Sequence, residues 1–303
     1  MKDLLFEYDM HLDFAPPVEE HRFTLKCIPL TDERQLINRL DVEVYPKEFL
    51  STDKDSFGNY SIYGYTKGKH DRFFARVRGQ ARTGLAPYLT AKEEHQVGLF
   101  KYQTDYTRPG PEILNFAKQF ESAAEKYRKS CEVSKDPTAP IANTMGNIKD
   151  RTCFHEQEII STNAATSALD LAVTLMHGLY KHFTYVQGVT DVRTTAEEAM
   201  ALGKGVCQDY SHILLSLCRI WKIPCRYVVG MLIGEGLSHA WVEIYSNGRW
   251  YALDPTNNLI VDDQHIKISA GRDYHDCIVS QGVFVGRTTQ TQTVAVRVKE
   301  INP

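Results

Sequence analysis

The stretch that decides the fold of this chain is "GKGVCQDYSHILLSLCRIW", residues 203–221. After Cys207 it is apolar on nearly every side, and a helix that is hydrophobic all round is a central, buried one. Gly203 and Gly205 bring the chain tightly into the first turn, and Pro224 stops the helix near its far end. The stretch therefore predicts a buried helix that begins at a cysteine.

Cys207 has two possible roles at that position. The free N–H groups and the dipole at a helix N-terminus favour an anion, so they favour a thiolate and supply donors for an oxyanion. Most cysteines of an intracellular protein are instead inert, small hydrophobic residues of the core. The helix alone leaves both interpretations of Cys207 open, and a nearby base is needed to decide between them.

The stretch "SHAWVEIYSNGRWYALDP", residues 238–255, predicts a β-hairpin. Asn247-Gly248 is the preferred dipeptide for a two-residue type I′ turn, and the flanking residues alternate as in strands. With that turn, Glu243 faces Ala252 across the hairpin. The same register places the side chains of His239 and Asp254 on one face, as diagonal neighbours within reach of each other.

Such a His–Asp pair also has two interpretations. A buried aspartate fixes the tautomer of a histidine and stabilises its imidazolium, as the third member of a catalytic triad does. The pair could equally serve only to tie two strands together.

The remaining histidines are poorer partners for the thiol. His212 lies five residues along the same helix, about 140° round it, and so points elsewhere. His177 and His182 flank an apolar helical face, where a structural histidine is usual. His265 and His275 have no carboxylate at a matching register.

Composition narrows the class of protein. The 303 residues are 43% hydrophobic and 24% charged, with a formal net charge of -3 and no basic cluster, so neither nucleic acid nor a membrane is an expected partner. The start of the chain lacks the apolar run of a signal peptide, and no stretch approaches the roughly 20 apolar residues of a membrane span. The seven scattered cysteines show no CxxC pattern, so we expect no disulfide framework, no structural zinc and a cytoplasmic location.

Two domains are expected, 1–105 and 106–303. The first contains short alternating stretches that predict a small antiparallel β-sandwich: "RFTLKC" (22–27), "DVEVYP" (41–46) and "RFFARVRG" (72–79). The second begins where "RPGPEILNF" (108–116) changes to a helical period, and it continues with a loop over 131–152.

Two further helices are expected in the second domain. In "SALDLAVTLMHGLYKHF" (167–183) one face carries Leu169, Ala172, Val173, Met176, Tyr180 and Phe183, which predicts an amphipathic helix. In "TAEEAMAL" (195–202) Thr195 is the expected N-cap of a shorter helix.

Three motifs resemble those of the transglutaminase-like superfamily, a papain-related group of thiol enzymes. They are "GVCQDYSH" (205–212), "SHAWVEIY" (238–245) and "WYALDPTNN" (250–258), which hold the Cys, His and Asp motifs of the family in order. The resemblance is strong over roughly 165–300. More weakly, the strands of 1–105 resemble the N-terminal β-domain of bacterial transglutaminase-like proteins.

The resemblance implies both a fold and a catalytic triad. The fold is α+β, with the N-terminal antiparallel β-sandwich followed by a papain-like core in which a central helix packs on an antiparallel sheet. Cys207 would be the nucleophile, His239 the base and Asp254 the orienting carboxylate. No metal or cofactor is expected, since "VDDQ" (261–264) is a bare acidic pair unlike the calcium sites of animal transglutaminases.

Other site residues are less well defined. Animal transglutaminases use an upstream tryptophan to bind the oxyanion, but no tryptophan precedes Cys207 here. Tyr185 and Gln187 are the candidate side-chain donors, although they could also be an ordinary strand aromatic and loop polar residue; the backbone N–H of the cysteine is a further donor. Gln208 and Trp241 are the expected substrate contacts.

The implied reaction is acyl transfer from an amide through a cysteinyl thioester, with a peptide or protein as substrate. Water as acceptor would make the protein a cysteine peptidase or amidase, and a lysine amine would make it a transglutaminase. Hydrolysis is favoured because it needs no channel for a second substrate. A non-catalytic peptide-binding module is the alternative of another class, but such relatives usually lose a triad member. The sequence gives no oligomeric state.

Overall fold

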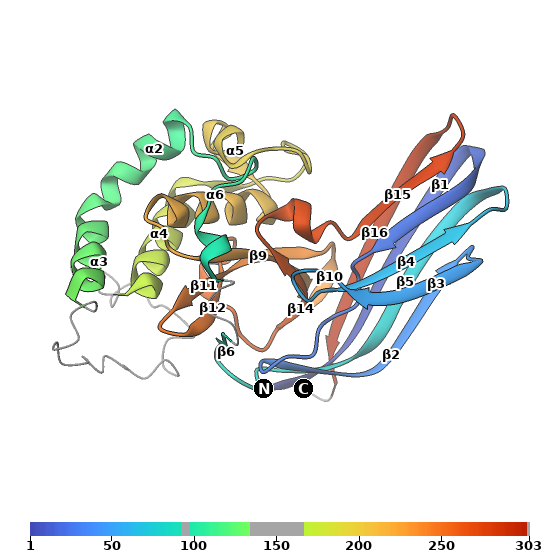
Figure 1. The fold of residues 1–303 in the computed structure, drawn as a ribbon, viewed down its shortest axis with the longest axis horizontal. Helices are drawn as coiled ribbons and strands as arrows, with labels where there is room; N and C mark the ends of the chain where they lie inside the picture. Colours follow the sequence, from blue (N-terminus) through green and yellow to red (C-terminus); the bar gives the residue numbers. More distant parts are fainter. Residues whose placement is uncertain (92–96, 134–166, 302–303) are drawn as a thin grey trace.

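The computed structural model describes residues 1–91, 97–133 and 167–301. The strands of residues 2–83 gather at one side, and the helices gather at the other, over a second sheet (Figure 1). The described ends of the chain lie side by side, because Leu4 pairs with Glu300 in neighbouring strands. None of the helices in the described ranges is long and apolar enough to cross a membrane.

One long strand organises the β unit, which comprises residues 2–83 and 280–300 together with the short strand at 234–236. β1 (Lys2–Leu25) buries alternate side chains, as expected for a strand with one face on a core. Its first part pairs with β5 (His70–Thr83) and β16 (Thr289–Glu300), and its last part pairs with β4 (Tyr60–Thr66) and β15 (Ser280–Val285). β1 therefore contributes to both layers of the β unit: its first part lies in the layer with β5 and β16, and its last part lies in the layer with β4 and β15.

Eight antiparallel strands make up this sheet system; the other three are β2 (Gln35–Tyr45), β3 (Phe49–Lys54) and β10 (Gly234–Gly236). Aromatic rings pack between the strands. The ring centroids of Phe23 and Phe73 lie 4.6 Å apart, and those of Phe14 and Phe284 lie 5.1 Å apart. The predicted antiparallel β-sandwich is confirmed.

The predicted division at residue 105 needs a correction at the far end of the chain. β15 and β16 follow the helical core in sequence, yet both pair with β1. The physical reason is that these strands find their partners about 255 or more residues away, and local alternation does not reveal such a partner. The β unit therefore contains both described ends of the chain, and the helical core lies between them in sequence.

The helical core is built on a six-stranded sheet. Its strands are β6 (Leu89–Thr90), β9 (Cys225–Leu232), β11 (His239–Ser246), β12 (Arg249–Asp254), β13 (Leu259–Ile260) and β14 (His265–Gly271). The central helix α6 (Cys207–Ile220) packs on β9 and β11, and residues 209–219 are all buried. The buried helix that the sequence predicts, with Cys207 at its start, is confirmed, and so is the α+β class.

Further helices surround α6: α2 (Pro111–Ala117), α3 (Glu121–Val133), α4 (Ala168–His182), α5 (Ala196–Leu202) and the 3-10 turns η1 (Gly98–Lys101), η2 (Lys118–Phe120) and η4 (Tyr274–Cys277). Thr195 caps α5, as predicted, and Ser167 caps α4 in the same way. A loop was expected over 131–152, but α3 continues to Val133, so residues 131–133 are helical; the rest of that range lies outside the described residues.

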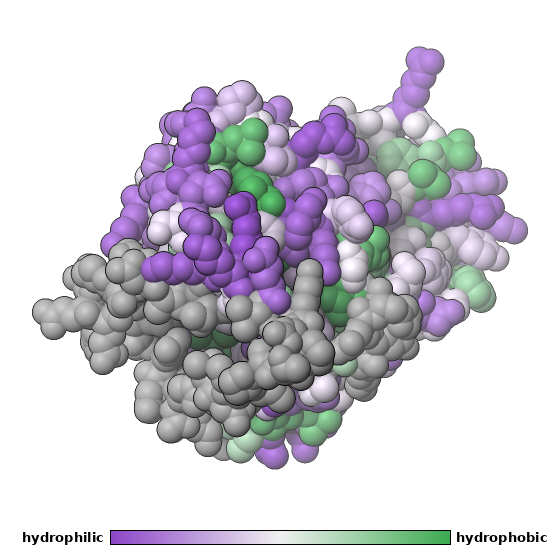
Figure 2. Space-filling model, turned by 60° about the vertical axis from the view of Figure 1, so that its left-hand side comes forward, coloured by the Kyte–Doolittle hydropathy of each residue, from purple (hydrophilic) through white to green (hydrophobic). Residues whose placement is uncertain are grey.

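The buried face of α4 differs in part from the predicted one. Leu171, Leu175 and Leu179 are fully buried, whereas the side chain of Tyr180 is exposed. The sequence of α4 is apolar on two adjoining stripes, so the position of α6 decides which stripe lies innermost. Where the helical side is coloured in Figure 2, it shows mainly hydrophilic residues with smaller hydrophobic patches between them.

Candidate active site

Cys207 is the first residue of α6, and a buried carboxylate holds the turn that leads into it. Oδ2 of Asp209 accepts hydrogen bonds from the N–H of Val206 and from the hydroxyl of Thr190, each at 2.7 Å. A Cβ on Gly205 would overlap the same oxygen, so only glycine fits there without displacement. Burial raises the pKa of Asp209, although these hydrogen bonds oppose the shift. This capping role of Asp209 was not predicted from the sequence.

The predicted hairpin is present with the predicted register. β11 and β12 pair Glu243 with Ala252, and Asn247 and Gly248 have φ values of 50° and 78°. Two successive positive φ values are the signature of a type I′ turn. The hairpin thus brings His239, at the start of β11, to Asp254, at the end of β12.

His239 contacts the carboxylate and lies near the thiol. Its Nε2 lies 2.7 Å from Oδ2 of Asp254, and the side chain of Cys207 is near enough to raise the pKa of the ring. Because Asp254 occupies Nε2, Nδ1 is the ring nitrogen left for the thiol. The side chain of His239 is 11% exposed and that of Asp254 is fully buried. The structure therefore places His239 against Asp254 and near Cys207, and the catalytic role of the three residues stays a prediction.

Electrostatics favour a charged His–Asp pair. Burial alone would lower the pKa of His239, but hydrogen bonds with Asp254 and Cys207 outweigh it and raise the pKa to about 10. Burial alone would raise the pKa of Asp254, but hydrogen bonds from His239 and His265 hold that pKa well below its ordinary value. An imidazolium beside a carboxylate is the expected state near neutral pH.

The turn after β12 fixes the other side of the carboxylate. Oδ1 of Asp254 accepts from the backbone N–H groups of Thr256 and Asn257, at 3.0 and 3.2 Å. The side-chain amide of Asn257 donates to Oδ2 at 2.8 Å. These contacts come from the segment "DPTN" itself, so a local turn orients the carboxylate before any distant residue contributes.

The expectation for His265 was wrong. Its Nε2 lies 3.2 Å from Oδ2 of Asp254, and its Nδ1 lies 3.1 Å from Oδ1 of Asp262. These contacts could not be predicted from the hairpin register, because β9 and β11 lie between β12 and β14 in the sheet order. The chain returns from Asp254 to the start of β14 within 11 residues, and that short return brings the two side chains together.

The oxyanion candidates lie beside the approach to Cys207. β7 (Thr184–Tyr185) runs parallel to β8 (Lys204–Gly205), and Tyr185 pairs with Gly205. The side chain of Tyr185 is exposed, and its hydroxyl lies 3.3 Å from Nε2 of Gln187. The donation of either side chain to an oxyanion stays a prediction.

The two expected substrate contacts differ in their surroundings. The side-chain amide of Gln208 donates to the carbonyl of Val192 at 3.2 Å, which holds a loop against the start of α6. Trp241 is only 1% exposed, and its ring covers Gly230, where it would overlap an added Cβ. Direct contact between Trp241 and a substrate does not fit this burial. The indole instead packs beside His239, with the ring centroids 6.2 Å apart.

His212 points away from the site, as expected. It is fully buried, and its Nε2 accepts a hydrogen bond from the backbone N–H of Tyr274 at 3.2 Å. Burial lowers its pKa to about 3, so the ring is neutral near pH 7. A structural role accounts for this histidine.

A possible metal-binding geometry also occurs here. Ligand-type atoms of His239, Asp254 and His265 lie within 4.8 Å of one another. The hydrogen bonds from both rings to the one carboxylate oxygen account for that spacing without an ion. We therefore describe the cluster as a hydrogen-bonded one.

Two family models match the chain. The model of the transglutaminase-like superfamily matches residues 156–255, and the model of the bacterial transglutaminase-like N-terminal region matches residues 5–82. The first match contains all three residues of the predicted triad, and the second lies within the β unit.

Relatives in other organisms add to these matches. An uncharacterised protein of Mycobacterium leprae is 35% identical over 127 residues, which cover 39% of this chain and 45% of that protein. An uncharacterised protein of Mycobacterium tuberculosis is 33% identical over 122 residues, which cover 35% and 39%. The chain thus matches less than half the length of either relative.

A solved structure of similar fold covers the whole chain. It is a protein of Cytophaga hutchinsonii described as a candidate cysteine protease, with a TM-score of 0.67 over 100% of this chain and 91% of that one. At 17% identity the likeness concerns the fold. The two family models show that this chain contains a transglutaminase-like core, at residues 156–255, and the bacterial N-terminal region of that group, at residues 5–82.

Proposed function

We propose that this protein is a cysteine peptidase or amidase, which cleaves amide bonds through a thioester on Cys207. The observation that carries the proposal is the hydrogen bond between His239 and Asp254, near a cysteine at the N-terminus of a buried helix. A nucleophile, a base and an orienting group within hydrogen-bond reach are the signature of covalent catalysis. The match of residues 156–255 to a superfamily of thiol enzymes supports the same interpretation.

Acylation begins with the thiolate of Cys207. Its sulfur attacks the carbonyl carbon of the amide, the C–S bond forms, and the π electrons move onto the oxygen. The N–H of Cys207, as the first residue of α6, is suited to stabilise this oxyanion, because the dipole of the helix favours negative charge there. When the oxyanion collapses, the C–N bond breaks and the amine leaves.

His239 transfers the proton in both steps of the reaction. Its Nδ1 gives a proton to the leaving amine, and Asp254 on Nε2 stabilises the imidazolium until that moment. The resulting neutral imidazole can then take a proton from water as the water attacks the thioester. The carboxylic acid leaves, and the thiolate and the imidazolium are restored.

Water is the acceptor that we favour. Cys207 is half-buried, so solvent can reach the thioester, and hydrolysis needs no second organic substrate. A positioned lysine amine would instead give an isopeptide, because both reactions share every step up to the thioester.

The test is turnover without an added amine. The purified protein is incubated with a panel of peptides and simple amides, and released ammonia or free amine is measured; Cys207→Ala is the control. We expect release that the control lacks. Product formation only with an added primary amine, as an isopeptide, would contradict hydrolysis and support amine transfer.

A further inference from the structure

A second histidine contacts the carboxylate of Asp254 from outside the hairpin. The side chains of His239, Asn257 and His265 all form hydrogen bonds with Oδ2 of Asp254, at 2.7, 2.8 and 3.2 Å. His239 belongs to the hairpin and Asn257 to the turn after it. His265 comes from β14, so it is the contact that ties the carboxylate to a different part of the sheet.

His265 is held at both of its ring nitrogens. Nε2 faces Asp254, and Nδ1 faces Oδ1 of Asp262, while the side chain is only 2% exposed. A carboxylate only accepts hydrogen bonds, so both contacts are satisfied at once when both ring nitrogens are donors. The side chains of His239, Asp254, His265 and Asp262 thus form one line of hydrogen-bonded groups, and Cys207 lies near its His239 end.

The β unit holds the far end of this line. The guanidinium of Arg34 donates to the carbonyl of Val261 at 2.6 Å, and the hydroxyl of Thr83 donates to the carbonyl of Asp263 at 2.5 Å. These two contacts flank Asp262 in the chain. The loop that carries Asp262 is therefore bound on both sides by residues of the β unit.

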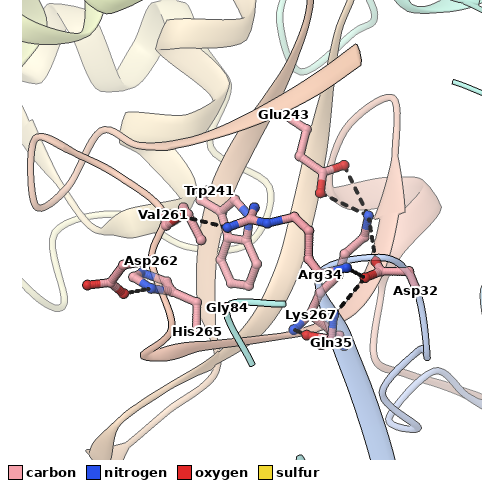
Figure 3. A pocket seen from close by; sticks show the side chains of 10 residues that line it. All are labelled: Asp32, Arg34, Gln35, Gly84, Trp241, Glu243, Val261, Asp262, His265 and Lys267. Atoms are coloured by element: carbon pink, nitrogen blue, oxygen red, sulfur yellow. Dashed lines mark hydrogen bonds and ion pairs between the residues drawn. The ribbon is translucent and has the colours of Figure 1, made fainter. Parts of the chain in front are cut away.

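The strand that carries His265 is fixed by the same unit. The side chain of Gln35, at the start of β2, donates to the carbonyl of Lys267 and accepts from its N–H, both at 2.8 Å. Figure 3 shows these residues around a cavity of only about 20 Å³, which has room for about one water molecule. Packing this close leaves His265 little freedom to move.

We infer that His265 is a positioning residue, which holds Oδ2 of Asp254 against His239 and through which the β unit supports the active site. The inference rests on the proposed function, because it assigns a role within that triad. His265 does not touch the thiol or a substrate. It acts by limiting rotation of the carboxylate, and a catalytic group displaced by about 1 Å can lose roughly 100-fold in rate.

Three substitutions of His265 separate the effect of hydrogen-bond donation to Asp254 from the effect of packing. The amide nitrogen of glutamine lies near the place of histidine Nε2, so His265→Gln keeps a donor for Asp254. The amide nitrogen of asparagine lies near the place of Nδ1, so His265→Asn keeps a donor only for Asp262. His265→Leu fills the space without a donor.

The readout needs no knowledge of the natural substrate. The rate constant for alkylation of Cys207 by iodoacetamide is measured by peptide mapping, with the melting temperature of each variant beside it. We expect His265→Asn and His265→Leu to slow alkylation roughly tenfold or more, and His265→Gln to stay within about threefold of wild type. His275→Gln, at an exposed histidine, is the matched control.

Two results would overturn the inference. One is equal alkylation in all three variants, and the other is a loss that follows melting temperature rather than the donor to Asp254. Failure of the proposed function is recognised separately: His239→Ala would then leave alkylation of Cys207 unchanged. On an active substrate, the loss in the asparagine variant should fall on kcat and leave KM nearly unchanged, because His265 lies behind the reacting groups.

Discussion

The ammonium of Lys267 lies 2.9 Å from Oε1 of Glu243, inside the protein, where the β unit meets the sheet of the helical core (Figure 3). Arg226 completes the cluster at 2.6 Å from the other carboxylate oxygen. Burial alone would raise the pKa of Glu243, but the two cations outweigh it and lower the pKa to about 2. Glu243 is therefore committed to this cluster and does not orient His239.

Removal of the Lys267 ammonium should leave the buried carboxylate of Glu243 poorly compensated. We expect Lys267→Met to lower the free energy of unfolding by about 3–5 kcal/mol, measured by urea denaturation. The double variant Lys267→Met/Glu243→Leu also removes the carboxylate, which only Arg226 would still balance in the single variant, and should recover part of that loss. Equal stability of the single variant and wild type would show that the ion pair contributes nothing.

Reactivity of the thiols should single out Cys207. Iodoacetamide should modify it at least about tenfold faster than Cys27, Cys218, Cys225 or Cys277, because those four are buried and Cys207 is half-buried beside an imidazole. His239→Ala should slow the reaction. Peptide mapping after a short exposure gives the ranking, and uniform labelling that ignores the histidine change would argue against the triad.

Asp254→Asn should keep the fold and lose the reaction. The substitution preserves size and burial but removes the charge that stabilises the imidazolium, so turnover should fall by about 10⁴-fold. Asp105→Asn, at an exposed aspartate, is the control and should have wild-type turnover. Substantial turnover in Asp254→Asn would mean that another group orients His239.

The raised pKa of His239 makes a prediction about alkaline pH. The pKa rises from 6.5 to about 10 on folding, so the folded state binds this proton more tightly than the unfolded chain does. The resulting stability is fully present below pH 6.5 and is lost as the pH rises through about 10. Urea denaturation at several pH values should show this loss in wild type and a smaller one in His239→Gln. Parallel pH profiles of the two proteins would contradict the assignment.

Gly205→Ala should disturb the start of α6. Its Cβ would overlap Oδ2 of Asp209, and that buried carboxylate has little room to move. We expect a loss of about 1–3 kcal/mol in stability, with slower alkylation of Cys207. Gly98→Ala is the matched control, because nothing lies within 4 Å of its added Cβ.

Local chemistry made much of the site predictable. Asn247-Gly248 selects one turn type, and that turn fixes which residues of the hairpin face each other, so His239 and Asp254 could be paired from the sequence. The apolar surroundings of Cys207 likewise predicted a buried helix. Both inferences depend on residues close together in the chain.

Contacts between segments that are distant in the sequence could not be predicted in this way. The approach of His265 to Asp254 depends on how the chain returns past two intervening strands, and the pairing of β16 with β1 depends on residues at opposite ends of the sequence. The innermost stripe of α4 depends on where α6 packs. None of these is encoded in a spacing or a single motif.

The pairing of β1 with β16 makes the helical core an insertion into the β-sandwich. Cutting the chain at residue 105 would therefore separate β1 from the two C-terminal strands that pair with it and expose hydrogen-bonding edges that invite aggregation. A circular permutation has the opposite effect: a short linker between the neighbouring ends, with new termini at an exposed turn, would leave every strand of the sandwich paired.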